Sequence, residues 1–168
     1  MDQRELRRVF GLFATGVTVV TATDGNGRPV GVTANSMASV SLQPPLLLWC
    51  LANKSGSLGA FQNEARFAVH ILAEDQIDVA LHFARSGIEK FPAFKPPVDD
   101  EPPVVEGAVA RIVCRVAALH AAGDHTIIVG QVDQVQTRNA QPLLFHSSRF
   151  GRFVPQDEPW SLLIDMWS

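Results

Sequence analysis

The spacing of hydrophobic residues predicts a short opening helix followed by strands. Asp2 and Glu5 are spaced as in a capping box, and the apolar residues 6, 9, 10 and 13 then fall on one helical face. Gly16 ends this pattern, and the β-branched run 17–23 favours a strand. Residues 24–27 read Asp-Gly-Asn-Gly, which is typical of a hairpin turn, so a second strand is expected over 30–33.

Further along the chain, apolar runs alternate with turn signals. The run 46–51 is hydrophobic on both faces and predicts a strand covered by protein on both sides. Residues 67–72 predict another strand, and the spacing within 75–84 predicts a short amphipathic helix. Five prolines between 92 and 103 predict an extended surface loop.

Two long strands, 108–121 and 125–137, are expected to close the domain around the tight turn 122–124. In the first, Ile112, Cys114 and Val116 alternate with three other residues, as in a half-buried strand; these are Arg111, Val113 and Arg115. Six or more strands, two or three short helices and no regular strand-helix alternation predict a mainly β fold, a mostly antiparallel β-barrel with a few peripheral helices. We expect one domain over 1–168, with a core of about 6–153 and a C-terminal tail of 154–168.

Composition narrows the class of partner. The chain has 168 residues, 46% of them hydrophobic, and 14 basic against 17 acidic side chains give a net charge of -3. The scattered Lys and Arg form no basic stripe, which argues against nucleic acid. No apolar stretch reaches the ~20 residues that cross a bilayer, and the charged N-terminus is unlike a signal peptide, so we expect a cytoplasmic protein. Cys50 and Cys114 allow at most one disulfide, fit a reducing compartment, and are interpreted as small core side chains.

Several common motifs fail. Residues 25–31 resemble a dinucleotide fingerprint, but the third glycine is one place late and Pro29 stands where a helix would start. Residues 55–59 lack the first glycine of a nucleophile elbow. The five histidines show no metal-ligand spacing, so no metal site is predicted, and no P-loop is present.

One polar segment remains between two apolar strands. Five residues of 31–42 carry a hydroxyl or amide, as a polar cofactor edge or a phosphate would require: Thr33, Asn35, Ser36, Ser39 and Ser41. A serine-rich loop that satisfies its own backbone is the alternative. Lys54, Ser55 and Ser57 add a cation and two hydroxyls before a helix expected at 58–63, an arrangement that suits an anion.

In their order along the chain, these residues resemble the short-chain flavin reductase family. The resemblance is carried by 15–21, by the Thr-Ala-Asn-Ser block at 33–36 with 39–42 and 44–46, and downstream by 67–69, Lys90-Phe91, the Gly-Asp-His of 123–125, 130–132 and 142–143. It covers about 6–153. It implies an FMN-binding split barrel of Greek-key type, a homodimer with flavin at its interface, and an NADH- or NADPH-dependent reductase of FMN or FAD, the reductase component of a two-component monooxygenase.

The resemblance also implies roles for individual residues. Thr33, Ala34, Asn35 and Ser36 would contact the ribityl and phosphate end of the flavin. The ring edge would be lined by Ser39, Val40 and Ser41, with Cys50, Leu51 and Ala52 passing beside it. The phosphate would be held by Lys54, Ser55 and Ser57, and Lys90 and Phe91 would approach the flavin.

His125 would lie near the nicotinamide, where it orients the ring or passes a proton to the reduced flavin. Hydride transfer itself needs no catalytic acid from the protein, so positioning is the expected role. A plain turn histidine is the alternative. The chain has no tyrosine, so aromatic contacts to the ligands fall to Phe, Trp or His, and the lack of a basic cluster favours NADH over NADPH.

Two rival functions and two further interpretations stay open. A flavin- or haem-binding carrier or sensor would have the same fold without turnover. An oxidase of a phosphorylated pyridoxine-type substrate would need more cations than Lys54 alone. Phe145, Phe150 and Phe153 are interpreted as core or dimer contacts, and the apolar tail 160–167 as a segment that packs on a partner subunit or covers the flavin site.

Overall fold

The computed structural model describes residues 2–62, 65–92 and 101–155, so the predicted tail segment 160–167 lies outside the described residues. Within them the chain forms helices α1 (Gln3–Phe10) and α2 (Ile77–Ala84), the short 3-10 helix η1 (Leu58–Ala60) and ten strands. The strands are β1 (Thr15–Gly16), β2 (Thr18–Thr23), β3 (Pro29–Ala34), β4 (Ala38–Leu42), β5 (Pro45–Ala52), β6 (Arg66–Ile71), β7 (Ala110–Ala122), β8 (His125–Thr137), β9 (Leu143–His146) and β10 (Arg149–Arg152).

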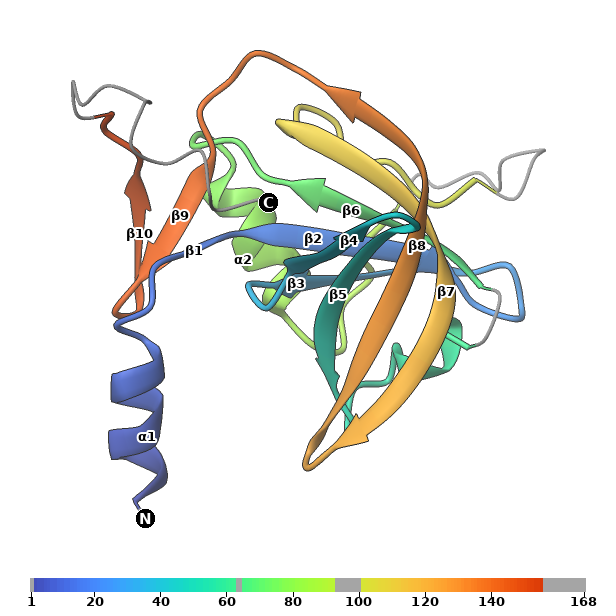
Figure 1. The fold of residues 1–168 in the computed structure, drawn as a ribbon, viewed down its shortest axis with the longest axis horizontal. Helices are drawn as coiled ribbons and strands as arrows, with labels where there is room; N and C mark the ends of the chain where they lie inside the picture. The colour runs from blue at the N-terminus through green and yellow to red at the C-terminus, as the bar shows by residue number, and fades with distance from the viewer. Residues whose placement is uncertain (1, 63–64, 93–100, 156–168) are drawn as a thin grey trace.

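Seven strands form one antiparallel sheet in the order β3-β2-β6-β7-β8-β5-β4, and β1, β9 and β10 form a small second sheet (Figure 1). The large sheet curls until β3 approaches β5, although the two strands do not pair by hydrogen bonds. The barrel is therefore split between β3 and β5. This architecture confirms the predicted mainly β barrel with few peripheral helices.

The predicted hairpin at 24–27 is confirmed, and its geometry follows from the sequence. The Asp24 carboxylate accepts hydrogen bonds from the backbone N–H groups of Asn26 and Arg28, both at 2.9 Å. These bonds, chiefly the one from Arg28, hold the pKa of Asp24 below its usual range. Gly27 has φ +75, a left-handed conformation that glycine adopts at little cost. The turn sets the register that pairs β2 with β3.

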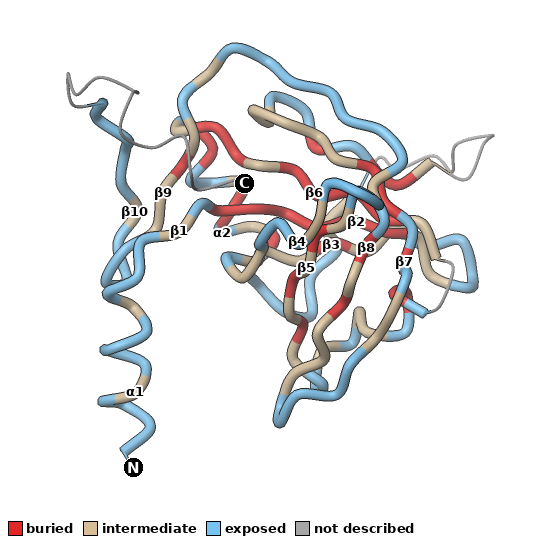
Figure 2. Tube along the Cα trace, viewed as in Figure 1, coloured by how far each residue is buried: buried red, intermediate tan, exposed pale blue. Residues whose placement is uncertain are grey.

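The barrel interior is filled by aromatic side chains. Trp49 is fully buried, with the ring of Phe61 at 4.9 Å and that of Phe67 at 6.2 Å. A Cβ at Gly130 would lie 2.4 Å from the Phe67 ring, so this site on β8 must be glycine for the ring to fit. A second cluster lies between α2 and the small sheet and includes Val17, Phe83 and Leu143 among its buried members. Figure 2 shows the buried residues running through β2, β5 and β6, whereas α1 has none.

Four local predictions need correction. Within this chain β5 is buried on one face only, because Leu47, Trp49 and Leu51 are buried and the residues between them are half-exposed. Of the helix expected at 58–63, the described residues, which reach 62, form only the three residues of η1. In β7 the alternation fails at a bulge between Val113 and Cys114, which leaves both residues buried.

The fourth correction concerns the proline-rich segment. Residues 93–100 of the predicted loop lie outside the described residues. Pro92 is exposed as expected, whereas Pro102 and Pro103 are buried against the barrel, so the surface prediction is wrong at this end of the segment. Thr21 donates to the carbonyl oxygen of Pro103 at 2.6 Å. Glu101 binds Arg66 at 2.8 Å and Arg111 at 2.9 Å, which holds the pKa of the Glu101 carboxyl below its usual range, Arg111 contributing most.

Among the described residues, no helix is both long and apolar enough to cross a membrane.

Candidate functional site

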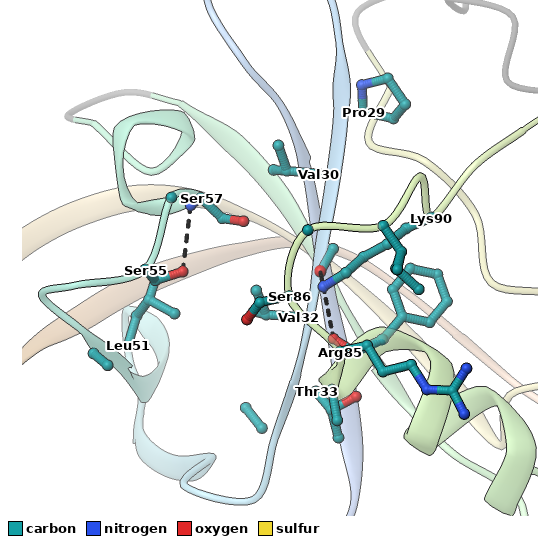
Figure 3. Close-up of a pocket in the computed structure, with 18 of the residues that line it drawn as sticks. Pro29, Val30, Val32, Thr33, Leu51, Ser55, Ser57, Arg85, Ser86 and Lys90 are labelled. Carbon is teal, nitrogen blue, oxygen red and sulfur yellow. Dashed lines mark hydrogen bonds between the residues drawn. The ribbon is translucent and has the colours of Figure 1, made fainter.

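A cavity of about 1010 Å3 opens at the split between β3 and β5. Small-molecule sites have volumes of ~300–1,000 Å3, so this cavity is large enough for a nucleotide. Its lining comes from three places: β3 with the turns around it, the end of β5 with residues 54–57 and His125, and the segment that leaves α2. Figure 3 shows Ser55 and Ser57 on one side of the cavity and Arg85 and Lys90 on the other.

Hydroxyl groups on the β3 side are used to hold the backbone. Thr33 Oγ1 donates to the carbonyl oxygen of Ala80 in α2 at 2.7 Å. Ser36 Oγ accepts from the backbone N–H of Cys50 at 2.9 Å and donates to the carbonyl oxygen of the same residue at 3.3 Å. These two side chains fix β3 against α2 and β5, so they shape the cavity wall. For these two residues, the expectation that polar side chains in this segment satisfy the backbone agrees with the structure.

The loop after β5 places one cation, Lys54, and two serines at the cavity. Lys54 is exposed and lines the cavity with Ser55 and Ser57. Ser55 Oγ accepts from the backbone N–H of Ser57 at 3.3 Å, and the Ser57 side chain makes no capping bond to η1. A lysine ammonium and two serine hydroxyls in one tight loop are the donors that bind a phosphate.

His125 begins β8 and reaches the same cavity. Its Nδ1 lies 2.7 Å from Oδ1 of Asp124, and its side chain is 46% exposed. Since a carboxylate only accepts, Nδ1 carries the proton in this pair, and Nε2 makes no hydrogen bond to the described residues. The hydrogen bond from His125, together with the charges of His125 and Lys54, holds the pKa of Asp124 below its usual range.

Asn53 fastens the hairpin of His125 to the loop of Lys54. Its backbone N–H donates to the carbonyl oxygen of Asp124 at 2.9 Å, and its side-chain Nδ2 donates to that of Gly123 at 3.1 Å. Its Oδ1 accepts from the hydroxyl of Thr126 at 2.8 Å. The sequence analysis did not single out Asn53, because only the pairing of β5 with β8 brings it next to residues seventy positions away.

Lys90 and Phe91 lie in the segment that leaves α2, and both line the cavity. The Lys90 ammonium donates to the carbonyl oxygens of Gly31 and Phe83, each at 2.7 Å. The Phe91 ring contacts that of Phe83 at 5.1 Å. Burial lowers the pKa of Lys90. The two residues therefore hold this wall in place from within the protein.

The structure gathers most of the predicted site residues around one cavity. Those that line it are Thr33, Ala34, Asn35, Ser36, Cys50, Leu51, Ala52, Lys54, Ser55, Ser57, Lys90, Phe91 and His125. The remaining three, Ser39, Val40 and Ser41, lie on β4 outside this lining, with Ser39 and Val40 exposed. The cavity is also lined by two arginines that the sequence did not mark as a pair, Arg28 and Arg85, since the hairpin and the end of α2 meet only in the folded chain.

The described residues contain no group of three or more His, Cys, Asp or Glu side chains that could hold a metal ion.

Cys50 and Cys114 are both free, and Cys114 is buried, which raises the pKa of its thiol to about 12. The predicted core position of Cys114 is confirmed, whereas Cys50 is half-exposed and lines the cavity.

Comparison with known proteins gives one consistent result. Residues 10–153 match the family described as the flavin reductase like domain. The NADH-dependent FMN reductase SmoA of Agrobacterium fabrum is 47% identical over 156 residues, which cover 92% of this chain and 88% of that protein. The reductase component of the 4-nitrophenol 4-monooxygenase/4-nitrocatechol 2-monooxygenase of Rhodococcus opacus is 37% identical over 155 residues, 92% of this chain and 83% of that protein.

The structural comparison agrees. The NADH:FAD oxidoreductase SgcE6 of Streptomyces globisporus, solved with NAD and FAD fragments, superposes with a TM-score of 0.84. That match has 38% sequence identity and covers 94% of this chain and 96% of the other. The predicted split-barrel fold and the predicted class of enzyme, an oxidoreductase that reduces flavin with a nicotinamide nucleotide, are thereby confirmed. The chain belongs to the flavin reductase-like family.

Proposed function

We propose that this protein reduces FMN or FAD with NADH and supplies the reduced flavin to a partner monooxygenase. One observation carries the proposal: a single cavity of nucleotide size joins a cationic loop, an apolar barrel wall and His125. The family supports it, since relatives are named as NADH-dependent reductases of FMN and of FAD and as reductase components of monooxygenases.

The residues of the cavity fit a flavin. Lys54, Ser55 and Ser57 offer a charge and hydroxyl donors to the phosphate, at one end of the cavity. Val30, Val32 and Leu51 present apolar surface beside them, which suits the face of a flat ring system. Asn35 stands where β3 ends, and its amide can pair with polar edges of the ligand. We therefore assign the phosphate to the Lys54 loop and the ring to the barrel wall.

When both ligands are bound, the nicotinamide donates a hydride directly to the flavin. The protein contributes by holding the two ligands in contact. His125 suits this role because Asp124 fixes its imidazole, and we propose that the ring orients the nicotinamide. Asn53 keeps the His125 hairpin at a fixed position relative to Lys54, so the sites for the two ligands are built on one rigid connection.

We also propose that two copies of the chain form a homodimer. Within one chain α1 has no buried residue, and it stands away from the barrel with Phe10 68% exposed (Figure 1). On β4, at the sheet edge, Leu42 is 73% exposed, and its neighbour β5 has one half-exposed face. Apolar surface of this kind suits burial against a second copy. Free cysteines and the use of NADH support the further proposal that the protein works in the cytoplasm.

The first test is NADH oxidation, followed by absorbance, with FMN, FAD or no flavin added and then repeated with NADPH. Turnover that rises and saturates with flavin is expected and would give both preferences. Flavin binding without turnover would instead favour a carrier or sensor.

A second test addresses His125. His125→Ala is expected to raise the KM for NADH or lower kcat while the Kd for flavin stays unchanged. His120→Ala is the matched control, because His120 is exposed on β7 and does not line the cavity. An equal loss of flavin affinity in His125→Ala would refute the assigned role.

A further inference from the structure

One wall of the cavity has no regular secondary structure to support it. Residues 84–92, here called the strap, leave the end of α2 and all line the cavity. Beyond Ala84 the strap is neither helix nor strand, and Gly87 turns it with φ +73. Something other than a helix or a sheet must therefore fix this wall.

Lys90 provides part of that support. Its Nζ donates to the carbonyl oxygen of Gly31 in β3 and to that of Phe83 near the end of α2, both at 2.7 Å. Figure 3 shows the ammonium between strap and strand, turned toward these backbone oxygens. Hydrogen bonds from a charged donor are short and about twice as strong as neutral ones, and both are partly buried. One side chain thus joins the strap to two separate elements.

The surrounding contacts are built around the same connection. The backbone carbonyl oxygen of Lys90 lies 3.1 Å from Nε2 of His82, so α2 also holds the strap at its main chain. The rings of Phe83 and Phe91 are in contact on the other side. A Cβ at Gly31 would lie 2.6 Å from the Phe83 ring, so the absence of a side chain there lets the ring pack close to β3. Hydrogen bonds and ring packing therefore hold the strap against β3 and α2.

The two lysines of the cavity differ in this respect. Lys54 is exposed in its loop, and its side chain makes no hydrogen bond to the described residues, so its charge is available to a ligand. Lys90 is half-buried, and two of its three N–H donors are taken by carbonyl oxygens. A ligand phosphate would have to compete with bonds that are already short.

We propose that Lys90 is a positioning residue for the flavin site, which clasps the strap to β3 and α2 instead of binding the flavin phosphate. This inference rests on the proposed function for the identity of the ligand, and it concerns a different role from the one that the family resemblance implies for Lys90. Loss of the clasp would loosen one whole wall of the cavity. Flavins with and without a phosphate would then lose affinity alike.

The test compares FMN with riboflavin, which has the same ring and no phosphate. Dissociation constants are measured by flavin fluorescence for the wild type, Lys90→Met and Lys54→Met. Lys90→Met is expected to weaken both flavins by the same factor, about tenfold. Lys54→Met, the matched control, is expected to weaken FMN and leave riboflavin unchanged. A Lys90→Met protein that loses FMN affinity only would show that Lys90 binds the phosphate, which overturns the proposal.

Limited trypsin digestion provides a readout that needs no ligand. Arg85 lies in the strap, and the exposed Arg138, which follows β8, serves as an internal reference. In Lys90→Met the cleavage after Arg85 is expected to be several-fold faster, while cleavage after Arg138 stays as in the wild type. Lys54→Met is expected to be cut after Arg85 and Arg138 at the wild-type rates, and it loses only the site at residue 54. His82→Ala, which keeps Lys90 and removes one strap contact, is expected to shift cleavage in the same direction.

The two readouts separate the failure of this proposal from the failure of the proposed function. Unchanged cleavage at Arg85 in Lys90→Met would overturn the clasp, whatever the flavin result. A wild-type protein that bound no flavin would refute the proposed function, and faster cleavage at Arg85 would still support the clasp.

Discussion

Lowering the pH is expected to destabilise the barrel through one buried histidine. His70, in β6, is fully buried between β2 and the segment that precedes β7. Its Nε2 accepts from the backbone N–H of Val105, and its Nδ1 faces the carbonyl oxygen of Val19, both at 3.2 Å. These partners suit only the neutral ring with its hydrogen on Nδ1, because a second N–H would meet the Val105 donor.

The structure sets the size of the effect. Burial, with a smaller effect of the Arg111 charge, lowers the pKa of His70 from 6.5 to about 4, against the hydrogen bond to Val19. Between pH 6.5 and 4, His70 is therefore protonated in the unfolded chain and neutral in the folded chain. The free energy of unfolding decreases as the pH falls through this range. A difference of this size is worth about 3 kcal/mol in full, and about 2 kcal/mol of it is lost between pH ~7.5 and ~5.

Urea unfolding of the wild type and of His70→Gln between pH ~7.5 and ~5 measures this loss of stability. Glutamine carries an amide oxygen that can accept from Val105, but it does not titrate. We expect the free energy of unfolding of the wild type to fall by about 2 kcal/mol more than that of His70→Gln. Carboxylates such as Glu101 and Asp124 affect both proteins equally and cancel in the difference. Parallel pH profiles for the two proteins would refute the reasoning.

Three further predictions concern the site and its supports. Gly31→Ala is expected to lower the free energy of unfolding, measured by urea denaturation, by about 1–3 kcal/mol, because the added Cβ would lie 2.6 Å from the Phe83 ring. Gly25→Ala is the control: its Cβ would have no atom within 4 Å, so the free energy of unfolding should stay almost unchanged. Thiol titration of the native protein should label Cys50 and not Cys114, whose buried thiol has a pKa of about 12; two rapid equivalents would contradict this. Asn53→Ala should raise the KM for NADH, as His125→Ala does, and the double variant His125→Ala/Asn53→Ala should show no further rise in KM. Additive effects of the two substitutions on KM would show that Asn53 acts elsewhere.

The sequence predicted the elements whose causes are local. The turn at 24–27 depends on Asp24 and Gly27 themselves, and the expected strands and α2 appear within a few residues of their predicted bounds. Two of the failures depend on partners distant in sequence. The bulge in β7 arises from its pairing with β8. One face of β5 is left half-exposed because no other described element covers it fully.

The candidate site shows the same division. Residue type alone marked Lys54, Ser55 and Ser57 as donors for an anion, and the fold places all three at one cavity. Residue type alone could not predict that Lys90 donates to two carbonyl oxygens, because one of them belongs to Gly31, 59 positions earlier in the chain. Asn53 gave no signal for a similar reason, since its partners come from the hairpin that ends β7.

The position of the site follows from how the barrel closes. Strands β3 and β5 approach without pairing, so their backbone and side chains face a gap that a flat ligand can enter. Hydrogen bonds to neighbouring elements hold the walls of this gap. Thr33, Ser36 and Asn53 fix the walls with bonds to α2, β5 and the β7–β8 turn, and Lys90 fixes the strap. Polar side chains at this site thus act in two groups, one that binds the ligand and one that keeps the gap in shape, and residue identity alone does not separate them.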